Sequence, residues 1–246
     1  MKNHINSIII GACIVITAVL LSGAWVKSHL NDSNKTTIRV TGKADRNFTS
    51  DLIVWNGSFS KKSETLSDAY QLVKKDQDVV NAYLQQKGVK EDEIKFSSIT
   101  IDKKFESIYN DKGYIVQTIF KGYELTQNVS IESKEVDKVE QISREVTELI
   151  NQGVEFYSNE PSYFFTKLSD LKIELLKAAT EDARKRAETI TTNAGSGLSN
   201  LVKSYMGVFQ ITAQNSTEEY EYGGSYNTTS KAKTISITVT LEYELK

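Results

Sequence analysis

The sequence has 246 residues, of which 39% are hydrophobic, and its 30 basic and 32 acidic residues give a formal net charge of −2. One Pro and 13 Gly leave little linker-like sequence, so the composition excludes disordered and collagen-like chains and predicts a sizeable buried core. Nucleic-acid binders are normally basic, with clustered Lys and Arg. The balanced charge of this chain therefore predicts no nucleic-acid partner.

Cysteine and histidine occur only near the N-terminus, as Cys13, His4 and His29. Beyond residue 30 this excludes disulfides, Cys-based zinc sites, Cys or His nucleophile pairs and Ser-His-Asp triads. An enzyme would have to use carboxylate, Lys or Tyr chemistry. A carboxylate-dependent hydrolase, for example, would need a pocket with two Asp or Glu residues about 5–10 Å apart. We predict that the chain is not an enzyme and uses no metal or cofactor.

The N-terminal segment predicts attachment to a membrane. Residues 8–26 carry no charge and are long enough to cross a bilayer as a helix. We expect residues 1–30 to be an anchor or signal segment and residues 31–246 to form a domain outside the cytoplasm. Two alternatives remain open at this point. Cleavage after Ala24 would release a secreted or periplasmic protein, and a lipobox-like stretch would make Cys13 a lipid attachment point.

The hydrophobic pattern predicts strands and three helices, in the order ββα ββ α β α ββ. The expected strands are residues 38–42, 52–59, 94–105, 114–131, 154–157, 198–212 and 234–245. The expected helices run from Ser63 to Gly88, from Ser133 to Gly153 and from Thr166 to Ala194. Gly122 is expected to mark a bulge, and alanines along the last helix favour close packing. This order indicates an α+β fold with largely antiparallel sheets.

Several stretches of the chain resemble the SIMPL-domain family. They are VTGKA (40–44), SDLIVWNGSF (50–59), GYELTQNVSIES (122–133), DLKIELLKAATEDARKRAE (170–188), MGVFQIT (206–212) and the closing strand. Together they span nearly all of residues 36–246. Ala44 stands where many relatives have a second Gly.

The resemblance implies an extracytoplasmic α+β module of two interleaved lobes, approximately 36–113 with 195–246 and approximately 114–194. It implies no catalytic residues. Bacterial relatives include an immunogenic outer-membrane protein that forms ring-like, channel-shaped oligomers, so self-assembly and an envelope-stress role are the functions the resemblance implies. The family name comes from a eukaryotic member associated with a receptor-linked kinase, and this activity does not transfer to a domain outside the cell.

A polar tongue is the main candidate site. Its carboxylates and tyrosines lie between two expected strands and are Glu218, Glu219, Tyr220, Glu221, Tyr222 and Tyr226. Tyr supplies contact area at low entropic cost, so the tongue could bind a partner, or it could be sensitive to calcium. It lacks the regular ligand spacing of a calcium loop, which favours a solvated hairpin tip over a ligand site.

Other charged and aromatic motifs have structural interpretations. Residues 181–186 predict i,i+4 ion pairs on a solvated helix, residues 193–197 a helix cap and turn, and residues 91–93 a solvated turn. Trp55 is expected in the core. We therefore predict an oligomerising or partner-binding scaffold in the cell envelope, a homo-oligomer with an unknown envelope protein partner, held to the membrane through residues 8–26. A ring- or channel-forming assembly is the alternative.

Overall fold

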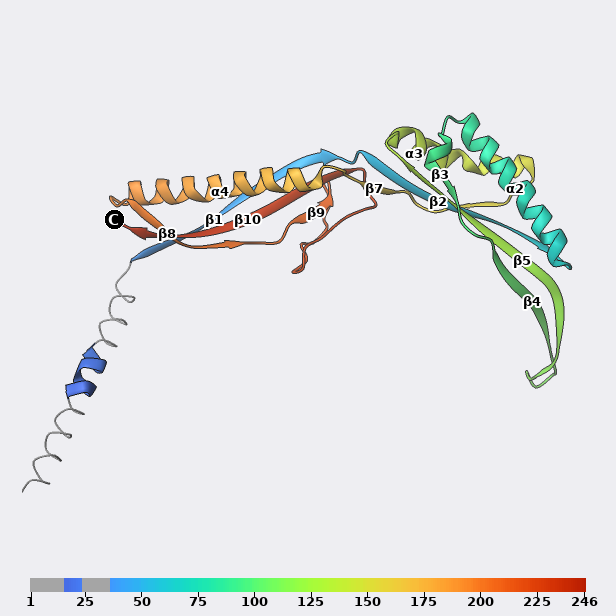
Figure 1. Ribbon diagram of the computed structural model, residues 1–246, viewed down its shortest axis with the longest axis horizontal. Helices are drawn as coiled ribbons and strands as arrows, with labels where there is room; N and C mark the ends of the chain where they lie inside the picture. Colours follow the sequence, from blue (N-terminus) through green and yellow to red (C-terminus); the bar gives the residue numbers. More distant parts are fainter. Residues whose placement is uncertain (1–15, 24–35) are drawn as a thin grey trace, which may run out of the picture. The chain divides into compact units, whose positions relative to one another are not determined.

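The computed structural model describes residues 16–23 and 36–246. Its strands are β1 (Thr37–Thr49), β2 (Leu52–Ser63), β3 (Ile94–Phe96), β4 (Thr100–Tyr109), β5 (Ile115–Ser133), β6 (Phe156–Ser158), β7 (Ser162–Phe164), β8 (Leu198–Met206), β9 (Gln210–Ala213) and β10 (Ala232–Leu245) (Figure 1). Its long helices are α2 (Leu66–Gln86), α3 (Val136–Glu145) and α4 (Leu168–Asn193), and two 3-10 helices span Glu91–Glu93 and Val146–Gln152. The sheets are antiparallel, which confirms the predicted α+β class.

Most of the expected membrane segment lies outside the described residues. Only residues 16–23 of that segment are described, and they are helical. Within the described part of the chain, no helix is both long and apolar enough to cross a bilayer. The expectations for Cys13, His4, His29 and cleavage after Ala24 fall on residues that the structure does not describe.

The predicted strand order is wrong in its number of strands, because the expected strands 94–105 and 198–212 are each divided in two and β7, beyond the expected strand 154–157, was not predicted. β3 and β4 separate at Ser97, whose hydroxyl accepts a hydrogen bond from Asn128 N at 3.1 Å in place of a backbone carbonyl. β6 and β7 both pair with β2, and Pro161, which has no N–H to donate, lies between them. β8 and β9 separate at residues 207–209. The observed order is ββα βββ α ββ α βββ.

The helix predictions hold, with small shifts at the ends. α2 begins two residues later than expected, because its N-cap is Thr65 rather than Ser63. The Thr65 side-chain oxygen accepts a hydrogen bond from Asp68 N at 3.2 Å. The second helix continues as the 3-10 helix Val146–Gln152 and ends at Gly153, which has a φ of 79°. The third predicted helix corresponds to α4.

The chain forms two compact units that interleave along the sequence. One unit contains residues 36–44, Glu174–Val208 and Ile237–Lys246, and the other contains Asp45–Ile173 and Phe209–Ser236. We call them the small unit and the large unit. These bounds differ from those of the two lobes expected from the sequence, 36–113 with 195–246 and 114–194.

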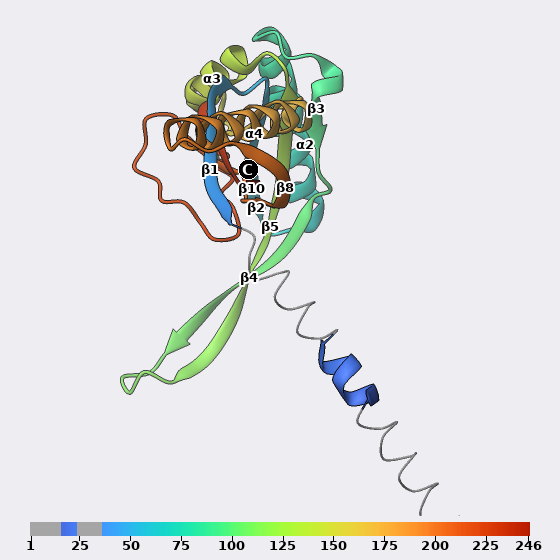
Figure 2. The ribbon, with the colours of Figure 1, turned by 90° about the vertical axis from the view of Figure 1, so that its left-hand side faces the viewer.

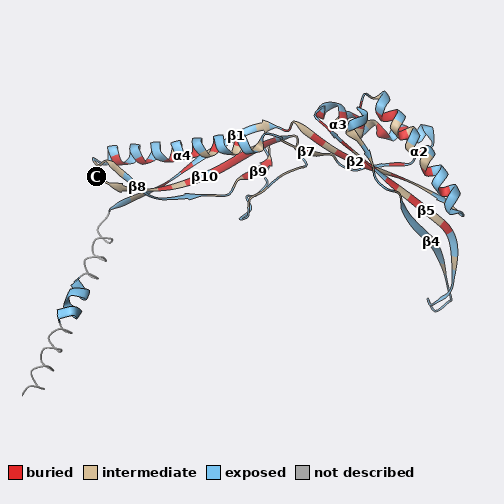
Figure 3. Cartoon of the chain, viewed as in Figure 1, coloured by how far each residue is buried: buried red, intermediate tan, exposed pale blue. Residues whose placement is uncertain are grey.

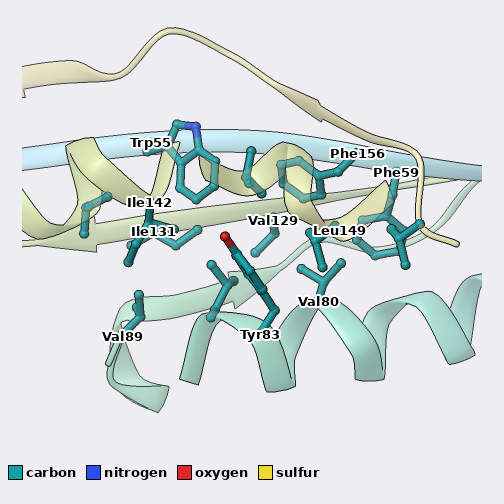
Figure 4. Close-up of a cluster of buried hydrophobic side chains, with 14 of the residues drawn as sticks. Trp55, Phe59, Val80, Tyr83, Val89, Val129, Ile131, Ile142, Leu149 and Phe156 are labelled. Atoms are coloured by element: carbon teal, nitrogen blue, oxygen red, sulfur yellow. The ribbon is translucent and has the colours of Figure 1, made fainter. Parts of the chain in front are cut away.

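The large unit has the larger buried core. A six-stranded sheet has the order β3-β5-β2-β6, with β4 also paired to β5 and β7 to β2. Side chains of β2, β5, α2 and α3 form one apolar cluster (Figure 4). Trp55 lies in it, as predicted, and donates from Nε1 to Ser158 Oγ at 3.0 Å. Figure 3 shows buried residues along β2, β5 and α2 of this unit.

The small unit depends on close contact between α4 and β1. Its sheet has the order β1-β10-β8. Ala179, Ala183 and Ala187 of α4 are fully buried, as the alanine pattern predicted. A Cβ on Gly42 of β1 would lie 2.3 Å from Ala179 O and 2.3 Å from Ala183 N. Gly42 therefore permits the helix backbone to approach the strand backbone directly.

Candidate interaction surface: the tongue and the arm

The predicted tongue, residues 218–226, is fastened to β9 by Gln210. The side-chain amide of Gln210 donates to Glu221 O at 2.8 Å and accepts from Ser225 N at 2.9 Å. Tyr226 forms a parallel bridge with Ile211, and Ile211 N donates to Ser225 O at 2.9 Å. The tongue connects β9 and β10, which pair antiparallel, so it is the connection of a hairpin as predicted. Its internal order was not foreseen.

The six candidate residues of the tongue have different environments. Glu218 accepts from Ala213 N at 2.9 Å and from Asn227 Nδ2 at 2.6 Å, so its carboxylate stabilises the loop. Ser236 Oγ donates to Tyr220 OH at 3.2 Å. The side chains of Glu219, Glu221, Tyr222 and Tyr226 are exposed, and tongue residues line a hollow of about 460 Å³. The tongue can thus offer two carboxylates and several aromatic rings to a partner.

A second surface, which the sequence analysis did not single out, is a two-stranded arm formed by residues 104–122. β2 pairs with β5 only as far as Ser63 opposite Tyr123, whereas β4 continues to pair with β5 to Tyr109 opposite Ile115. Within the described residues, β5 has no second neighbouring strand over 115–122. Figures 1 and 2 show this hairpin of β4 and β5 extending beyond α2.

Gly122 sets the direction of the arm. It has a φ of 106°, and a Cβ there would lie 2.3 Å from Ser63 O, where β2 ends. The register between β4 and β5 shifts at the same place, because Lys104 faces Gly122 and Phe105 faces Phe120. Lys121 is the extra residue of this bulge. The predicted bulge at Gly122 is therefore confirmed, and it lies where the sheet narrows to two strands.

The arm carries large apolar side chains that are exposed to solvent. Their exposed fractions range from 40% to 69%, and they are Phe105, Ile108, Tyr109, Tyr114, Ile115, Val116 and Phe120. The ring centroids of Phe105 and Phe120 are 5.6 Å apart, and those of Phe120 and Tyr123 are 5.2 Å apart. At about 200 Å² for a side chain of this size, roughly 700 Å² of apolar surface is exposed on the arm. This area is divided between the two faces of the arm, because Ile108 and Ile115 lie on the face opposite to Phe105 and Phe120.

Charged groups on the arm and at its base are paired across the strands. Lys121 Nζ lies 2.7 Å from Glu106 Oε2, and Lys104 Nζ lies 2.5 Å from Glu124 Oε2. The hydrogen bond from Lys104 holds the pKa of Glu124 below its usual value, with a smaller contribution from Lys62. The hydrogen bond to Glu106 correspondingly raises the pKa of Lys121. These pairs keep the arm near neutrality while its apolar side chains face solvent.

An apolar groove adjoins the base of the arm. It has a volume of about 710 Å³ and is lined by Leu66, Ser67, Tyr70, Ile99, Ile101 and Leu125. Leu66 and Tyr70 come from the first turns of α2, and Ile101 lies directly opposite Leu125 in the sheet. Ile101 and Phe105 are four residues apart on one strand and share a face. The exposed Lys103, opposite Tyr123, lies between them on the same face, so the groove and the aromatic residues of the arm share one face with a charged side chain between them.

The remaining motifs have structural roles. Arg186 pairs with Asp182 at 2.8 Å, as predicted, and Asp182 also accepts from Lys43 N at 2.9 Å. Gly195 has a φ of 73° at the end of α4, which confirms the helix cap. Glu93 accepts from Lys90 N at 3.2 Å in the short turn of residues 91–93.

The sequence contained one signal for the arm. From Tyr114 to Phe120, apolar residues occupy both odd and even positions of a strand, at Tyr114, Ile115, Val116, Ile119 and Phe120. This pattern is typical of a strand buried on both faces. In the described structure, these residues lie instead where the sheet has only two strands.

The two antiparallel sheets and the long α4 packed on an edge strand define an α+β domain, and residues 31–246 contain neither Cys nor His. The chain belongs to the SIMPL family, described as a protein of unknown function (DUF541), which matches residues 38–243. A search of curated proteins found no match.

Proposed function

We propose that this SIMPL-family chain is a non-enzymatic interaction scaffold of the cell envelope. Residues 8–26 hold it to the membrane, residues 31–246 lie outside the cytoplasm, and the arm is the surface that binds a second copy or another envelope protein. A binding surface can serve this function without chemistry at a reactive side chain.

The observation that carries the proposal is the exposed apolar surface of the arm. Burying it would stabilise a complex, because removing apolar surface from water contributes about 25 cal/mol per Å². The arm also has strand edges whose backbone donors and acceptors are unpaired within the described residues, and edges of this kind recruit further strands. An arm with both features is suited to association.

Two sequence features support the rest of the proposal. The uncharged run of residues 8–26 follows Lys2, and basic residues tend to stay on the cytoplasmic side. The domain also lacks the imidazole and thiol groups that most nucleophilic catalysis requires. Binding through surface shape is the function that remains best supported.

Site-specific photo-cross-linking of the full-length chain in intact cells tests the proposal. A benzophenone amino acid at Phe105 is expected to give a discrete covalent adduct of higher mass, because this side chain lies in the middle of the arm. The same probe at Gln86, an exposed residue near the end of α2, is the matched control. Equal adduct formation at both positions, or none at either, would refute the arm as the binding surface.

A further inference from the structure

We infer that two copies of the chain exchange arms, so that the tip of each arm lies in the apolar groove at the base of the other. The tip is the segment 109–115, and the groove is the one lined by Leu66, Tyr70 and Ile101. This inference rests on the proposed function, because it takes the arm as the binding surface and names its partner as a second copy.

Two-fold symmetry makes such an exchange reciprocal. Eight residues separate Ile101 at the groove from Tyr109 at the tip, or about 27 Å along a strand. The distance from base to tip is the same in both copies. Two arms that lie antiparallel about a two-fold axis therefore place each tip over the other groove at once, as an isologous interface requires.

Phe105 lies midway between Ile101 and Tyr109, on the side of the arm that continues into the groove. It is directly opposite Phe120 in the hairpin. A two-fold axis through the middle of the paired arms would bring the Phe105 and Phe120 rings of both copies together. Aromatic side chains at the centre of an interface are the typical hot spots of binding.

One face of the arm and the groove together approach the area of a stable interface. The roughly 700 Å² of apolar surface on the arm, at about 200 Å² for each whole side chain, is divided between its two faces, and the face of Phe105 and Phe120 is the one that continues towards the groove. Leu66, Tyr70 and Ile101 are a further 41%, 45% and 53% exposed around the groove. Specific interfaces bury about 800 Å² on each partner. Exchange of arms would cover the arm and the groove of both copies together.

The charges of the arm favour a protein partner over a lipid bilayer. The turn at the tip carries Asp111 and Lys112, which would enter a bilayer first, at about 2.5–3.5 kcal/mol for each charge at its centre. Asn110 closes this turn by accepting from Lys112 N and Tyr114 N, each at 3.0 Å. At the rim of a groove, both charged side chains can stay in water while Tyr109 and Tyr114 are covered.

Disulfide trapping tests the inference in the full-length chain. Cys13 is first changed to Ser, and Lys112→Cys at the tip is combined with Ser67→Cys in the groove. Oxidation of detergent-free cell extracts is expected to yield a covalent dimer. A reducing agent should convert this dimer back to monomer, and its formation should require both introduced cysteines. A bond within one chain is excluded by the arm length, because two joined cysteines have Cα atoms less than about 7 Å apart.

Two controls identify the contact. Gln86→Cys combined with Lys112→Cys is expected to give at least tenfold less dimer, because Gln86 lies at the other end of α2 from the groove. Adding Phe105→Ser to the trapping pair is expected to reduce the dimer to the same level, while the circular dichroism spectrum stays unchanged.

The outcomes separate the inference from the proposed function. If the cysteine at 112 bonds only to a different protein, or becomes protected from a membrane-impermeant maleimide only when vesicles are present, the second copy is not the occupant and the inference is overturned. The arm would then still be a binding surface. If neither trapping nor photo-cross-linking gives any adduct, both the inference and the proposed function are overturned.

Discussion

Lys233 is a basic residue that is almost completely buried. Its exposed fraction is 1%, and its Nζ donates to Ser50 Oγ at 2.9 Å and to Tyr163 O at 2.5 Å. Both acceptors are uncharged, so no carboxylate compensates for the loss of water around the ammonium group. Burial lowers the pKa of Lys233 from 10.5 to about 8.

The lowered pKa of Lys233 predicts a stability that rises with pH. Between about pH 8 and 10.5 the unfolded chain binds a proton at this residue and the folded chain does not. The free energy of unfolding should therefore increase across this window, by up to about 3 kcal/mol, and the gain should be lost as the pH falls towards 8. Urea unfolding at several pH values measures the slope.

Lys233→Met isolates this contribution, because Met is similar in length and does not titrate. The variant should have a flatter profile between pH 8 and 10.5, whatever the other lysines and tyrosines contribute. Parallel profiles for the two proteins would show that Lys233 keeps its proton in the folded chain.

Gly42 carries a second prediction at the scale of one residue. Gly42→Ala places a methyl group 2.3 Å from backbone atoms of α4, which must then move away from β1. Overpacking of this kind costs about 1–3 kcal/mol. Urea unfolding should show the loss, and Gly197→Ala is the control, because the nearest atom to a Cβ there is the flexible Lys246 side chain at 3.6 Å. An equal effect of both substitutions would contradict the role of Gly42 in helix packing.

At the scale of the elements, Gly122 determines how the arm leaves the sheet. Gly122→Ala places a residue with a side chain at a backbone φ of 106°, which such residues rarely adopt. It also places a Cβ 2.3 Å from Ser63 O. Such backbone strain costs about 1–3 kcal/mol. The variant should also form at least tenfold less of the trapped dimer, because a redirected arm no longer matches the groove of a second copy.

Gly113→Ala is the matched control for Gly122. Gly113 also has a positive φ, of 78°, but nothing lies within 4 Å of the Cβ position. Its substitution should strain the turn without redirecting the arm at its base. Comparable loss of dimer in both variants would mean that the bulge has no special part in placing the arm.

The elements that were predicted well are those whose pattern is set locally. The strand predicted over 234–245 corresponds to β10, in which the alternating residues Ile235, Ile237, Val239 and Leu241 are buried. Periodicity predicted neither the division of β3 from β4, where the hydroxyl of Ser97 interrupts the ladder, nor the short strand β7 beyond Pro161. These breaks depend on which strand lies alongside, and that is a property of the folded sheet.

The candidate site was harder to predict than the fold. The tongue was located, but its attachment through Gln210 joins residues eleven and fifteen positions apart and has no periodic signature. The arm was missed because its exposure depends on where β2 ends, at Ser63, some fifty residues before Ile115. Apolar residues at both odd and even positions of a strand indicate burial on both faces, unless the neighbouring strand is known to end before them.

At the scale of the whole molecule, the two units have separate cores. Every side chain of the main apolar cluster lies in the large unit, whereas Val40, Leu175, Ala183 and Leu241 are buried within the small unit. Destabilising one core should therefore act first on its own unit, because proteins open locally in cooperative parts.

Hydrogen exchange measured by mass spectrometry tests this separation with two variants. Leu84→Ala creates a cavity in the core of the large unit and should lower its free energy of unfolding by about 2–5 kcal/mol. It should speed exchange in β2, β5 and α2 more than in residues 38–43 and 176–190. Gly42→Ala should give the reverse pattern. If both variants speed exchange equally throughout residues 36–246, the chain unfolds as one cooperative body and the two cores are not energetically separate. In that case β10 and α4, which each contribute residues to both units, would carry the full loss of stability from one unit to the other.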